Sequence, residues 1–396
     1  MKLKYLNLSL FFEQSQFLLP VMLFFYFKNG LTVSDYIFFQ SITYVLYMLF
    51  GVPVGYISDH ISKKYALIIG YMLNVGRLLI YMFWGGYAVV LTGEILMTFI
   101  RFYTTGIADS YIFEYLKEKK REKEMLSLSG KALMFMSFGV ATGSLLGPII
   151  YKNFGFEILL FVEFIFSSVG TLLLLKLPKT EIYNKQSYSL KDIKKACYSL
   201  WENRNVRWIV VCNMFLYAAT TVFVSTFQPL MKLSLVPVVL FGAVYFSNHL
   251  IRGISSKLTR RFVSIFGLEN LMKAGLFGVI LGFLLMLCAF EIKNPYLTLA
   301  SLFYVCLIIG LQLINQISNI NEIHQSISPH VRATGISIYN MLCRGFGGIV
   351  LAIFQKISQG FDEGNKGYLV FAIAFTFILI FFDFIKLKKN SAKRHN

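Results

Sequence analysis

Charge is scarce in this 396-residue chain, and acidic residues are scarcer than basic ones. Only 15% of the residues are charged, whereas 56% are hydrophobic, and the mean hydropathy is +0.63. A soluble domain of this length exposes far more charge to water, so the composition excludes one. Alternating apolar and polar segments of about ten residues, which a membrane β-barrel requires, are also missing. The composition therefore predicts an all-α membrane protein that crosses the bilayer many times.

Patterns for catalysis and metal binding are missing as well. The five cysteines show neither metal-ligand spacing nor a disulfide framework, and we interpret them as small apolar residues: Cys197, Cys212, Cys288, Cys306 and Cys343. The chain contains no ATP-binding loop, no His/Cys cluster and no hydrophilic segment large enough for a catalytic domain. We therefore expect no enzyme, no cofactor and no metal.

Long apolar runs are what the chain has in abundance. Each is about 20 residues long, enough to cross a hydrocarbon core of about 30 Å. We predict twelve spans, at residues 6–27, 35–57, 65–83, 89–115, 128–151, 156–176, 207–231, 236–258, 268–291, 296–320, 333–357 and 366–387. The first follows Lys2 and Lys4 without a small-residue cleavage site, so we expect it to stay uncleaved.

The net charge of +18 is distributed unevenly between the two sides of these spans. The side without the termini holds few basic residues: Lys28, Lys152, Lys232, Lys293, Lys356 and Lys366. Because cytoplasmic loops carry the excess of Lys and Arg, both termini are predicted to be cytoplasmic. This distribution accounts for the positive charge without a nucleic-acid partner. The low Pro and high Lys, Ile, Phe and Asn content fits a bacterial inner-membrane protein.

Two short basic hairpins indicate an internal duplication. The first carries Gly55, Asp59, Lys63 and Lys64, and the second has Arg260-Arg261 at the position of the Lys pair and Ser256 at the position of Asp59. We infer two six-span bundles, 1–177 and 206–396, joined by a cytoplasmic linker, 178–205, with one amphipathic helix near 189–203. Duplicated halves are typical of transporters with a site at their interface, and they suit alternating access better than an open channel.

The first hairpin resembles the loop 2–3 signature of the major facilitator superfamily, with Lys where Arg is frequent, and the resemblance extends over essentially the whole chain. It implies that Asp59 engages the opposing half and helps to stabilise the outward-facing state. On this basis Gly55, Asp59, Lys63 and Lys64 form a conformational latch. The alternative is that Asp59 caps a helix end and balances the nearby lysines.

Span 128–151 carries glycines that resemble the antiporter motif of the same family, which implies export. Gly130, Gly139, Gly143 and Gly147 precede Pro148, but Ser144 stands where Pro is usual and Pro148 replaces the second Gly of a pair. Small residues every four positions let helices approach closely, and Pro148 introduces a kink. The alternative interpretation is ordinary close helix packing.

Span 89–115 adds a further likeness. Arg101 stands where many members have a membrane-embedded Arg, although the following Gly comes at Gly106 rather than one residue earlier. The run from Thr105 to Glu114 resembles the end of the fourth span in drug-efflux-like bacterial members. We therefore favour a proton-coupled exporter of small organic molecules. The alternative is a proton-coupled importer of a nutrient or organic anion.

Acidic residues inside spans are candidates for the coupling proton. A charged side chain near the bilayer centre costs about 2.5–3.5 kcal/mol, so each requires a partner or a wet cavity. The candidates are Glu13, Asp109 and Glu94, with Arg101 as the charge partner, and we rank Glu13 and Asp109 above Glu94. Glu114 is expected at the wet cytoplasmic end, paired with Lys117 to Lys120.

The resemblance implies that spans 1, 4, 7 and 10 line a central cavity. Polar residues of these spans, with one Arg of span 11, are the cavity candidates: Gln16, Thr105, Asn213, Tyr217, Gln312, Asn315, Gln316, Asn319 and Arg344. Intramembrane Arg252 and Arg344 suggest an anionic substrate, or else Arg252 reaches to the cytoplasm and Arg344 bonds to carbonyls. We expect a monomer whose partners are a small-molecule substrate, protons and the lipid bilayer.

Overall fold

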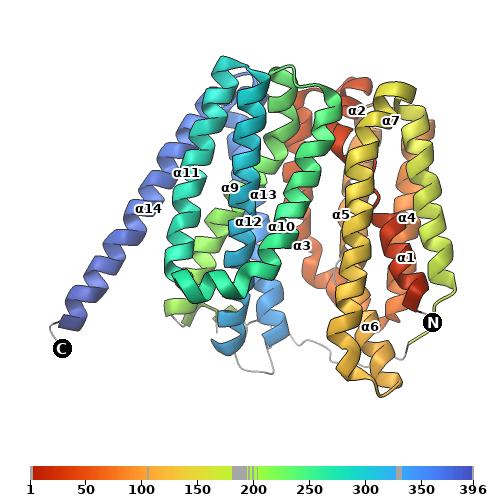
Figure 1. Cartoon of the computed structure of the whole chain (residues 1–396), viewed down its shortest axis with the longest axis horizontal. Coiled ribbons are helices and arrows are strands. Elements are labelled where there is room, and N and C mark those ends of the chain that lie inside the picture. The colour runs from red at the N-terminus through yellow and green to blue at the C-terminus, as the bar shows by residue number, and fades with distance from the viewer. Residues whose placement is uncertain are drawn as a thin grey trace.

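Every regular element in the described part of the chain is a helix. The computed structural model describes residues 3–104, 107–180, 194, 197, 198, 200–202, 204–326 and 332–394. The start of the first helix and the end of the last lie at the same end of the molecule, and the long helices run between this end and the other (Figure 1). We call the two ends the terminal end and the opposite end.

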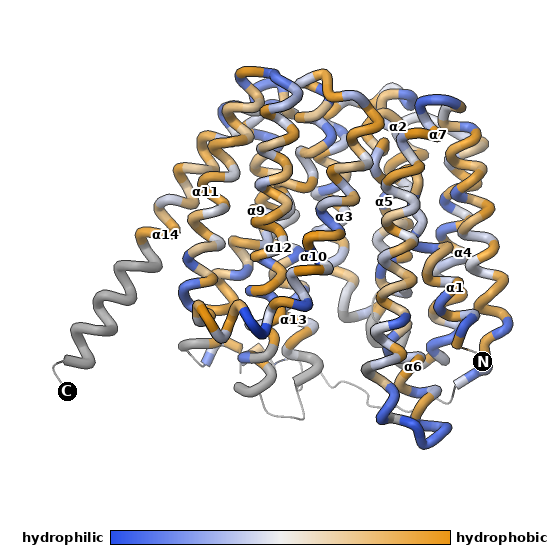
Figure 2. Tube along the Cα trace, in the orientation of Figure 1, coloured by the Kyte–Doolittle hydropathy of each residue, from blue (hydrophilic) through white to orange (hydrophobic). Residues whose placement is uncertain are grey.

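Ten helices of the described residues are long and apolar enough to cross a membrane: Leu3–Lys28, Val33–Gly51, Lys63–Phe83, Tyr87–Glu118, Ser127–Leu175, Val206–Leu233, Val238–Phe266, Leu268–Ile292, Pro295–Ile320 and Gly335–Ile357. A shorter apolar helix covers Gly364–Ile380. Apolar residues follow the helices through the middle of the molecule, and polar residues gather toward its two ends (Figure 2). This confirms the prediction of an all-helical protein with many membrane-crossing helices.

The first group of helices covers the N-terminal part of the chain. Its elements are α1 (Leu3–Gln14), η1 (Leu19–Val21), α2 (Met22–Lys28), α3 (Val33–His60), α4 (Lys63–Phe83), α5 (Tyr87–Thr104), α6 (Ile107–Glu118), η2 (Glu122–Glu124) and α7 (Met125–Leu175). A capping box starts α3: the Thr32 side chain accepts a hydrogen bond from the Asp35 amide, and the Asp35 carboxylate accepts one from the Thr32 amide at 2.8 Å.

Helix α7 contains two membrane-length segments that run in opposite directions. Gly155 interrupts it with a φ of 78°, which favours glycine. Before this point, Gly139 and Gly147 approach Phe11 and Phe17, and after it Gly170 approaches Ser9, so the chain returns along α1. The break falls between the predicted spans 128–151 and 156–176.

The second group follows residue 203. Its elements are α9 (Arg204–Leu233), α10 (Val238–Phe266), α11 (Leu268–Ile292), α12 (Pro295–Ser326), α13 (Arg332–Ile357), η4 (Gln359–Phe361) and α14 (Gly364–Arg394). Within it α9 packs on α12 and α13, α10 on α12, and α11 on α12 and α14. Most of the predicted linker, including 181–193, lies outside the described residues, so its amphipathic helix stays a prediction.

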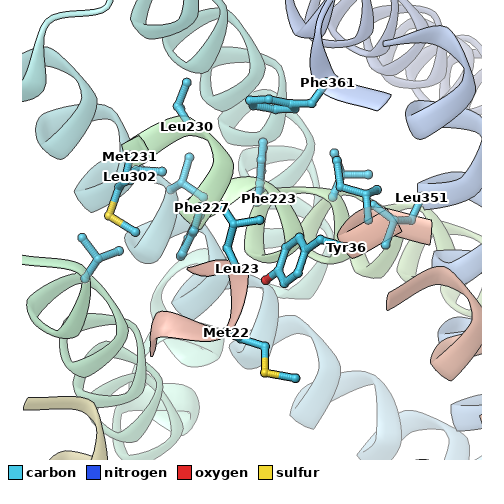
Figure 3. Packing of buried hydrophobic residues seen from close by; sticks show 14 of the residues in the cluster. Met22, Leu23, Tyr36, Phe223, Phe227, Leu230, Met231, Leu302, Leu351 and Phe361 are labelled. Atoms are coloured by element: carbon cyan, nitrogen blue, oxygen red, sulfur yellow. The ribbon is translucent and has the colours of Figure 1, made fainter. Parts of the chain in front are cut away.

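The two groups pack against each other through α3 on α13 and α7 on α10. Glycines permit this contact: a Cβ at Gly242 of α10 would lie 2.1 Å from the Ser144 carbonyl oxygen of α7, and one at Gly345 would overlap Met48. One apolar cluster joins both groups, and Figure 3 shows Leu23 and Tyr36 beside Phe223 and Phe227. The groups therefore share a core as well as a surface.

The predicted basic hairpin connects α3 and α4 through Ile61 and Ser62 alone. Gly55 and Asp59 fall within α3, in a stretch whose side chains are outside the description, and Lys63 is buried at the start of α4. The Lys64 ammonium donates to the carbonyl oxygens of Leu175 and Leu177 at 2.9 and 2.6 Å, where it satisfies carbonyls at the end of α7. The latch role of these residues stays a prediction.

Candidate functional site

A cavity of about 220 Å³ lies between the two groups of helices. Most of its lining residues are polar or charged, and they come from both groups of helices. The lining residues are Gln16, Leu18, Leu19, Met22, Tyr36, Gln40, Tyr44, Arg77, Glu94, Met97, Arg101, Glu163, Tyr217, Thr220, Thr221, Val224, Ser225, Tyr245, Asn248, His249, Arg252, Gln312 and Gln316. Such a lining offers hydrogen bonds and charge to the polar groups of a solute, beside apolar surface for the rest of it.

The first crossing is broken where it meets this cavity. Helix α1 ends at Gln14 and η1 starts at Leu19, so residues 15–18 form no regular helix. The break frees backbone amides that a continuous helix would satisfy, and one of them, the Leu18 N–H, donates to the Glu163 carboxylate at 2.7 Å. The sequence analysis treated this span as a continuous helix, although Pro20 is a signal for the interruption.

A buried charged network lies behind the break. The Glu13 carboxylate accepts hydrogen bonds from Asn74 Nδ2 at 3.0 Å and Ser167 Oγ at 2.9 Å. Arg77 donates to Asn74 Oδ1 from Nε and Nη2 at 3.0 and 2.9 Å, and its Nη2 also lies 3.3 Å from Glu163 Oε1. Glu13, Arg77 and Glu163 are each at most 4% exposed. Arg77 and Glu163 reach the cavity lining whereas Glu13 does not, so the network connects a deeply buried carboxyl group to the cavity wall.

Glu94 extends the charged region into the cavity. It is buried on α5, and its electrostatic neighbours are Arg77 and Arg101. Both Glu94 and Arg101 line the cavity, which is where the sequence analysis expected the polar stripe of this helix to lie. Arg101 therefore neighbours Glu94, whereas the guanidinium nearest to Glu13 in the network is that of Arg77.

The other predicted cavity residues divide into two sets. Gln16, Tyr217, Gln312 and Gln316 line the cavity. Asn213 and Asn315 are buried against helix backbone, where they donate to the carbonyl oxygens of Ile209 and Leu271 at 3.1 and 3.2 Å. Asn319 is also buried away from the cavity, and the Arg344 guanidinium stacks 4.0 Å from the Tyr47 ring centre. A helical stripe identifies a face, but neighbouring helices decide which part of that face reaches the cavity.

The end of the fourth crossing differs from the expectation. Asp109 is exposed on α6, apart from the cavity lining, and Thr105 lies outside the described residues. We expected Glu114 at a wet surface, and this is wrong: Glu114 is buried and accepts a hydrogen bond from Thr180 Oγ1 at 2.7 Å. The cause is the chain that follows α7, which covers α6 and also accepts a hydrogen bond from Tyr111 at Pro178.

Three residues of the network were not predicted as site residues from the sequence: Asn74, Arg77 and Glu163. Sequence reasoning also missed the cavity residues of α3, which are Tyr36, Gln40 and Tyr44. The signal for Arg77 and Glu163 was available, since both are ionisable residues inside predicted spans. The resemblance directed attention to spans 1, 4, 7 and 10, whereas these residues lie in spans 2, 3 and 6.

The glycines of α7 pack against the broken first crossing. A Cβ at Gly139 would lie 2.3 Å from the Phe11 carbonyl oxygen, one at Gly143 2.7 Å from the Gln16 nitrogen, and one at Gly147 2.1 Å from the Phe17 carbonyl oxygen. Gly130 has no atom within 4 Å of such a Cβ. Pro148 instead faces Gly242 of α10. Three of the four glycines therefore bring α7 against the backbone of the first crossing, and Gly143 does so at Gln16, which lines the cavity.

A polar cavity enclosed between two groups of membrane-length helices, with buried charges at its wall, defines the class of secondary transporters. The sequence matches the family profile described as Major Facilitator Superfamily over residues 6–352. The chain belongs to this family, and it is a transporter rather than an enzyme. No curated protein matches the sequence.

Solved transporters share the fold. The nucleoside transporter NupG superposes with a TM-score of 0.78 at 16% identity, over 96% of this chain and 98% of that chain. A POT family transporter in complex with a thioalcohol-conjugated peptide gives 0.72 at 14% identity, over 96% of each chain. A bacterial homologue of the human lysosomal transporter Spinster gives 0.69 at 14% identity, over 91% of this chain and 82% of that chain. At these identities the likeness concerns the fold alone.

Proposed function

We propose that this protein is a proton-coupled exporter of small polar organic molecules, of the drug/proton antiport type. The two bundles 1–177 and 206–396, joined by 178–205, alternate access to the cavity. Twelve crossings result when Ser127–Leu175 counts as two and Gly364–Ile380 as the last. The excess of Lys and Arg places both termini in the cytoplasm of a bacterial inner-membrane protein, which acts as a monomer.

The observation that carries the proposal is the charge balance of the buried network. Three carboxyl groups, Glu13, Glu94 and Glu163, share the region with two guanidinium groups, Arg77 and Arg101. An uncompensated charge buried in a membrane protein costs several kcal/mol. One bound proton makes the five groups neutral together, and its release leaves one excess negative charge. Such a site binds and releases a proton whenever its environment changes.

Glu13 is the group that we assign to this proton. Glu163 pairs with Arg77 and also accepts the Leu18 amide, and Glu94 neighbours both arginines. Glu13 accepts hydrogen bonds only from the neutral groups of Asn74 and Ser167 among the described residues. Of the three carboxyl groups, it therefore has the least direct compensation for a negative charge. Export is supported by the close glycine packing of α7, the segment that resembles the antiporter motif.

Glu13→Gln should uncouple transport from protons. We expect proteoliposomes with this variant to show no substrate-linked proton flux, whereas substrate exchange without a pH gradient continues. The Gln amide can accept from Asn74 and donate to Ser167, but it binds no proton. The measurement follows a panel of cationic, neutral and anionic organic solutes, with a pH-sensitive dye inside the liposomes. Glu157→Gln, which removes an exposed acid of α7, is the control and should leave coupling intact. Unchanged proton flux in Glu13→Gln would overturn the assignment.

A second candidate is import of an organic anion. Arg101 of α5 and Arg252 of α10 both line the cavity, and neither forms an ion pair with a carboxylate of the described residues. His249 lies beside Arg252 on the same lining. A carboxylate-bearing solute would pair with these groups across the interface of the two bundles.

Arg252→Gln separates the two candidates. If the substrate is an anion, the variant should lose about tenfold or more of its anion uptake, because a charge-assisted hydrogen bond contributes about 1.5–3 kcal/mol. The measurement is initial uptake of the anionic members of the panel under an inward proton gradient. Lys152→Gln, an exposed residue of α7, is the control. Retained uptake by the variant, together with active transport of cations, would exclude the anion importer.

A further inference from the structure

Gln228 of α9 is a fully buried polar side chain whose two backbone partners lie in the other group of helices. Its Oε1 accepts the Leu23 amide at 2.8 Å, and its Nε2 donates to the Leu19 carbonyl oxygen at 2.9 Å. Nε2 also donates to the Tyr245 hydroxyl of α10 at 2.8 Å. Figure 3 shows Leu23 packed beside Phe227, the neighbour of Gln228 on α9, within the apolar cluster shared by both groups.

The two backbone partners of Gln228 are a helical pair. In a continuous α-helix the Leu23 N–H would donate directly to the Leu19 carbonyl oxygen, four residues earlier. Here the amide of Gln228 stands between them and bonds to both. A side chain inserted into this hydrogen-bond ladder is one of the recognised causes of a sharp helix break. The junction of η1 and α2, directly after the irregular residues 15–18, is therefore held in part by a residue of the other bundle.

We propose that Gln228 is a positioning residue that acts as a wedge in the first membrane crossing. Inserted, it keeps η1 and α2 from forming one helix and holds the two bundles together at the opposite end. Withdrawn, it lets Leu23 N–H bond directly to Leu19, so residues 19–28 become one continuous α-helix as the opposite end opens. The Leu19 carbonyl and the Leu23 amide keep partners in both states, so movement between the states leaves neither backbone group unsatisfied.

The wedge is connected to the buried network, and this link rests on the proton-coupled function proposed above. From Leu18 the hydrogen bonds pass through Glu163, Arg77 and Asn74 to Glu13. The ionisable groups that face Glu13 are Arg77 from α4, Glu163 from α7 and Tyr71 from α4. Loss of the Glu13 proton creates a carboxylate that competes with Glu163 for Arg77. The Leu18 end of the break is then held less firmly, so proton loss favours withdrawal of the wedge.

Gln228→Met tests the wedge, because Met has a similar shape and makes no such hydrogen bonds. The matched control is Gln355→Met. Gln355 of α13 also forms a hydrogen bond between the bundles at the opposite end, to Ser34 Oγ of α3 at 2.7 Å. This bond does not involve the first crossing. Spin labels are placed at the exposed Trp84 and Leu235 of the two bundles, in protein whose five native cysteines are replaced by Ala and which is reconstituted into proteoliposomes.

We expect Gln228→Met to raise the ratio of long to short label distances by on the order of tenfold, because about two to three hydrogen bonds of the closed state are lost. In the parent protein this ratio should rise with pH. Gln228→Met should lose most of that pH response, whereas Gln355→Met should keep it. Equal distances and equal pH responses in the two variants would overturn the proposal. If only Glu13→Gln loses the pH response of the distance ratio, Glu13 is the proton site and the wedge proposal is wrong.

Amide hydrogen exchange of residues 15–24 gives a second measurement. The wedge and a purely stabilising role predict opposite changes in the exchange rate at Leu23. If Gln228 is a wedge, Gln228→Met should slow exchange at Leu23, since its amide then bonds within its own helix. If Gln228 merely stabilises the fold, exchange there should accelerate, and this result would overturn the proposal. Gln228→Asn, whose side chain is too short to bond both Leu19 and Leu23, should give the same slowing if the Met variant fails to fold.

Discussion

Arg77→Met should destabilise the protein more than any other single substitution considered for this fold. The change leaves Glu163 without its ion-pair partner and leaves Asn74 Oδ1 without two donors, all at positions at most 4% exposed. Removal of one partner from a buried ion pair costs about 3–5 kcal/mol. Thermal unfolding of the detergent-solubilised protein, followed by loss of the monodisperse peak, measures the effect.

Two variants sharpen the interpretation of this result. Arg101→Met is the comparison, because Arg101 lines the cavity and forms no ion pair with a described carboxylate. Its loss should lower the unfolding temperature less than the loss of Arg77, since Glu94 still has Arg77 as a neighbour. Arg77→Met combined with Glu163→Gln should recover part of the stability, since no unpaired carboxylate remains at that position. If the double variant were no more stable than Arg77→Met, charge compensation would not be the cause.

Gly147→Ala should be the most damaging change in the glycine series of α7. Its new Cβ would lie 2.1 Å from the Phe17 carbonyl oxygen, which is backbone and cannot rotate away. Overpacking of a tight site costs about 1–3 kcal/mol, and here the strain falls on the broken segment that lines the cavity. We expect lower thermal stability and loss of transport together, measured by unfolding in detergent and by uptake in proteoliposomes.

Gly130→Ala is the control within the same helix. A Cβ at Gly130 meets nothing within 4 Å, and alanine is the stronger helix former, so this variant should be as stable as the parent or slightly more so. Gly143→Ala, at 2.7 Å from the Gln16 nitrogen, should rank between the two. If the three Ala variants had equal thermal stability and transport, the close contact of Gly147 with Phe17 would not be the cause of the damage.

Glu13 could be predicted as a candidate from the sequence, but its hydrogen-bond partners could not. An acid within an apolar run is visible in the sequence, because its burial is costly and demands a reason. Its partners were not visible: Asn74, Ser167 and Arg77 lie in two other crossings, and the distances along the chain carry no information about their approach. The sequence analysis paired the acids with Arg101, which neighbours Glu94 in the structure.

For the cavity, too, the sequence indicated the polar residues but not which of them line it. The amide stripe of α12 was recognisable by its helical spacing, but Gln312 and Gln316 reach the cavity whereas Asn315 bonds to the backbone of α11. Residues one turn apart share a face of their helix, and the packing of α9 and α11 on α12 divides that face into a wet and a dry part. Asp109, a proton candidate of the same span as Glu94 and Arg101, does not line the cavity.

By itself the sequence determined the class of protein, the membrane-length helices and the family, because apolar runs and a short basic hairpin are local features that require no knowledge of contacts. The tertiary structure decided the charged network, the break in the first crossing and the place of Gln228. The reason is physical: the hydrogen-bond ladder at Leu19 and Leu23 is interrupted by an amide 205 residues further along the chain, and only packing of the two bundles brings it there.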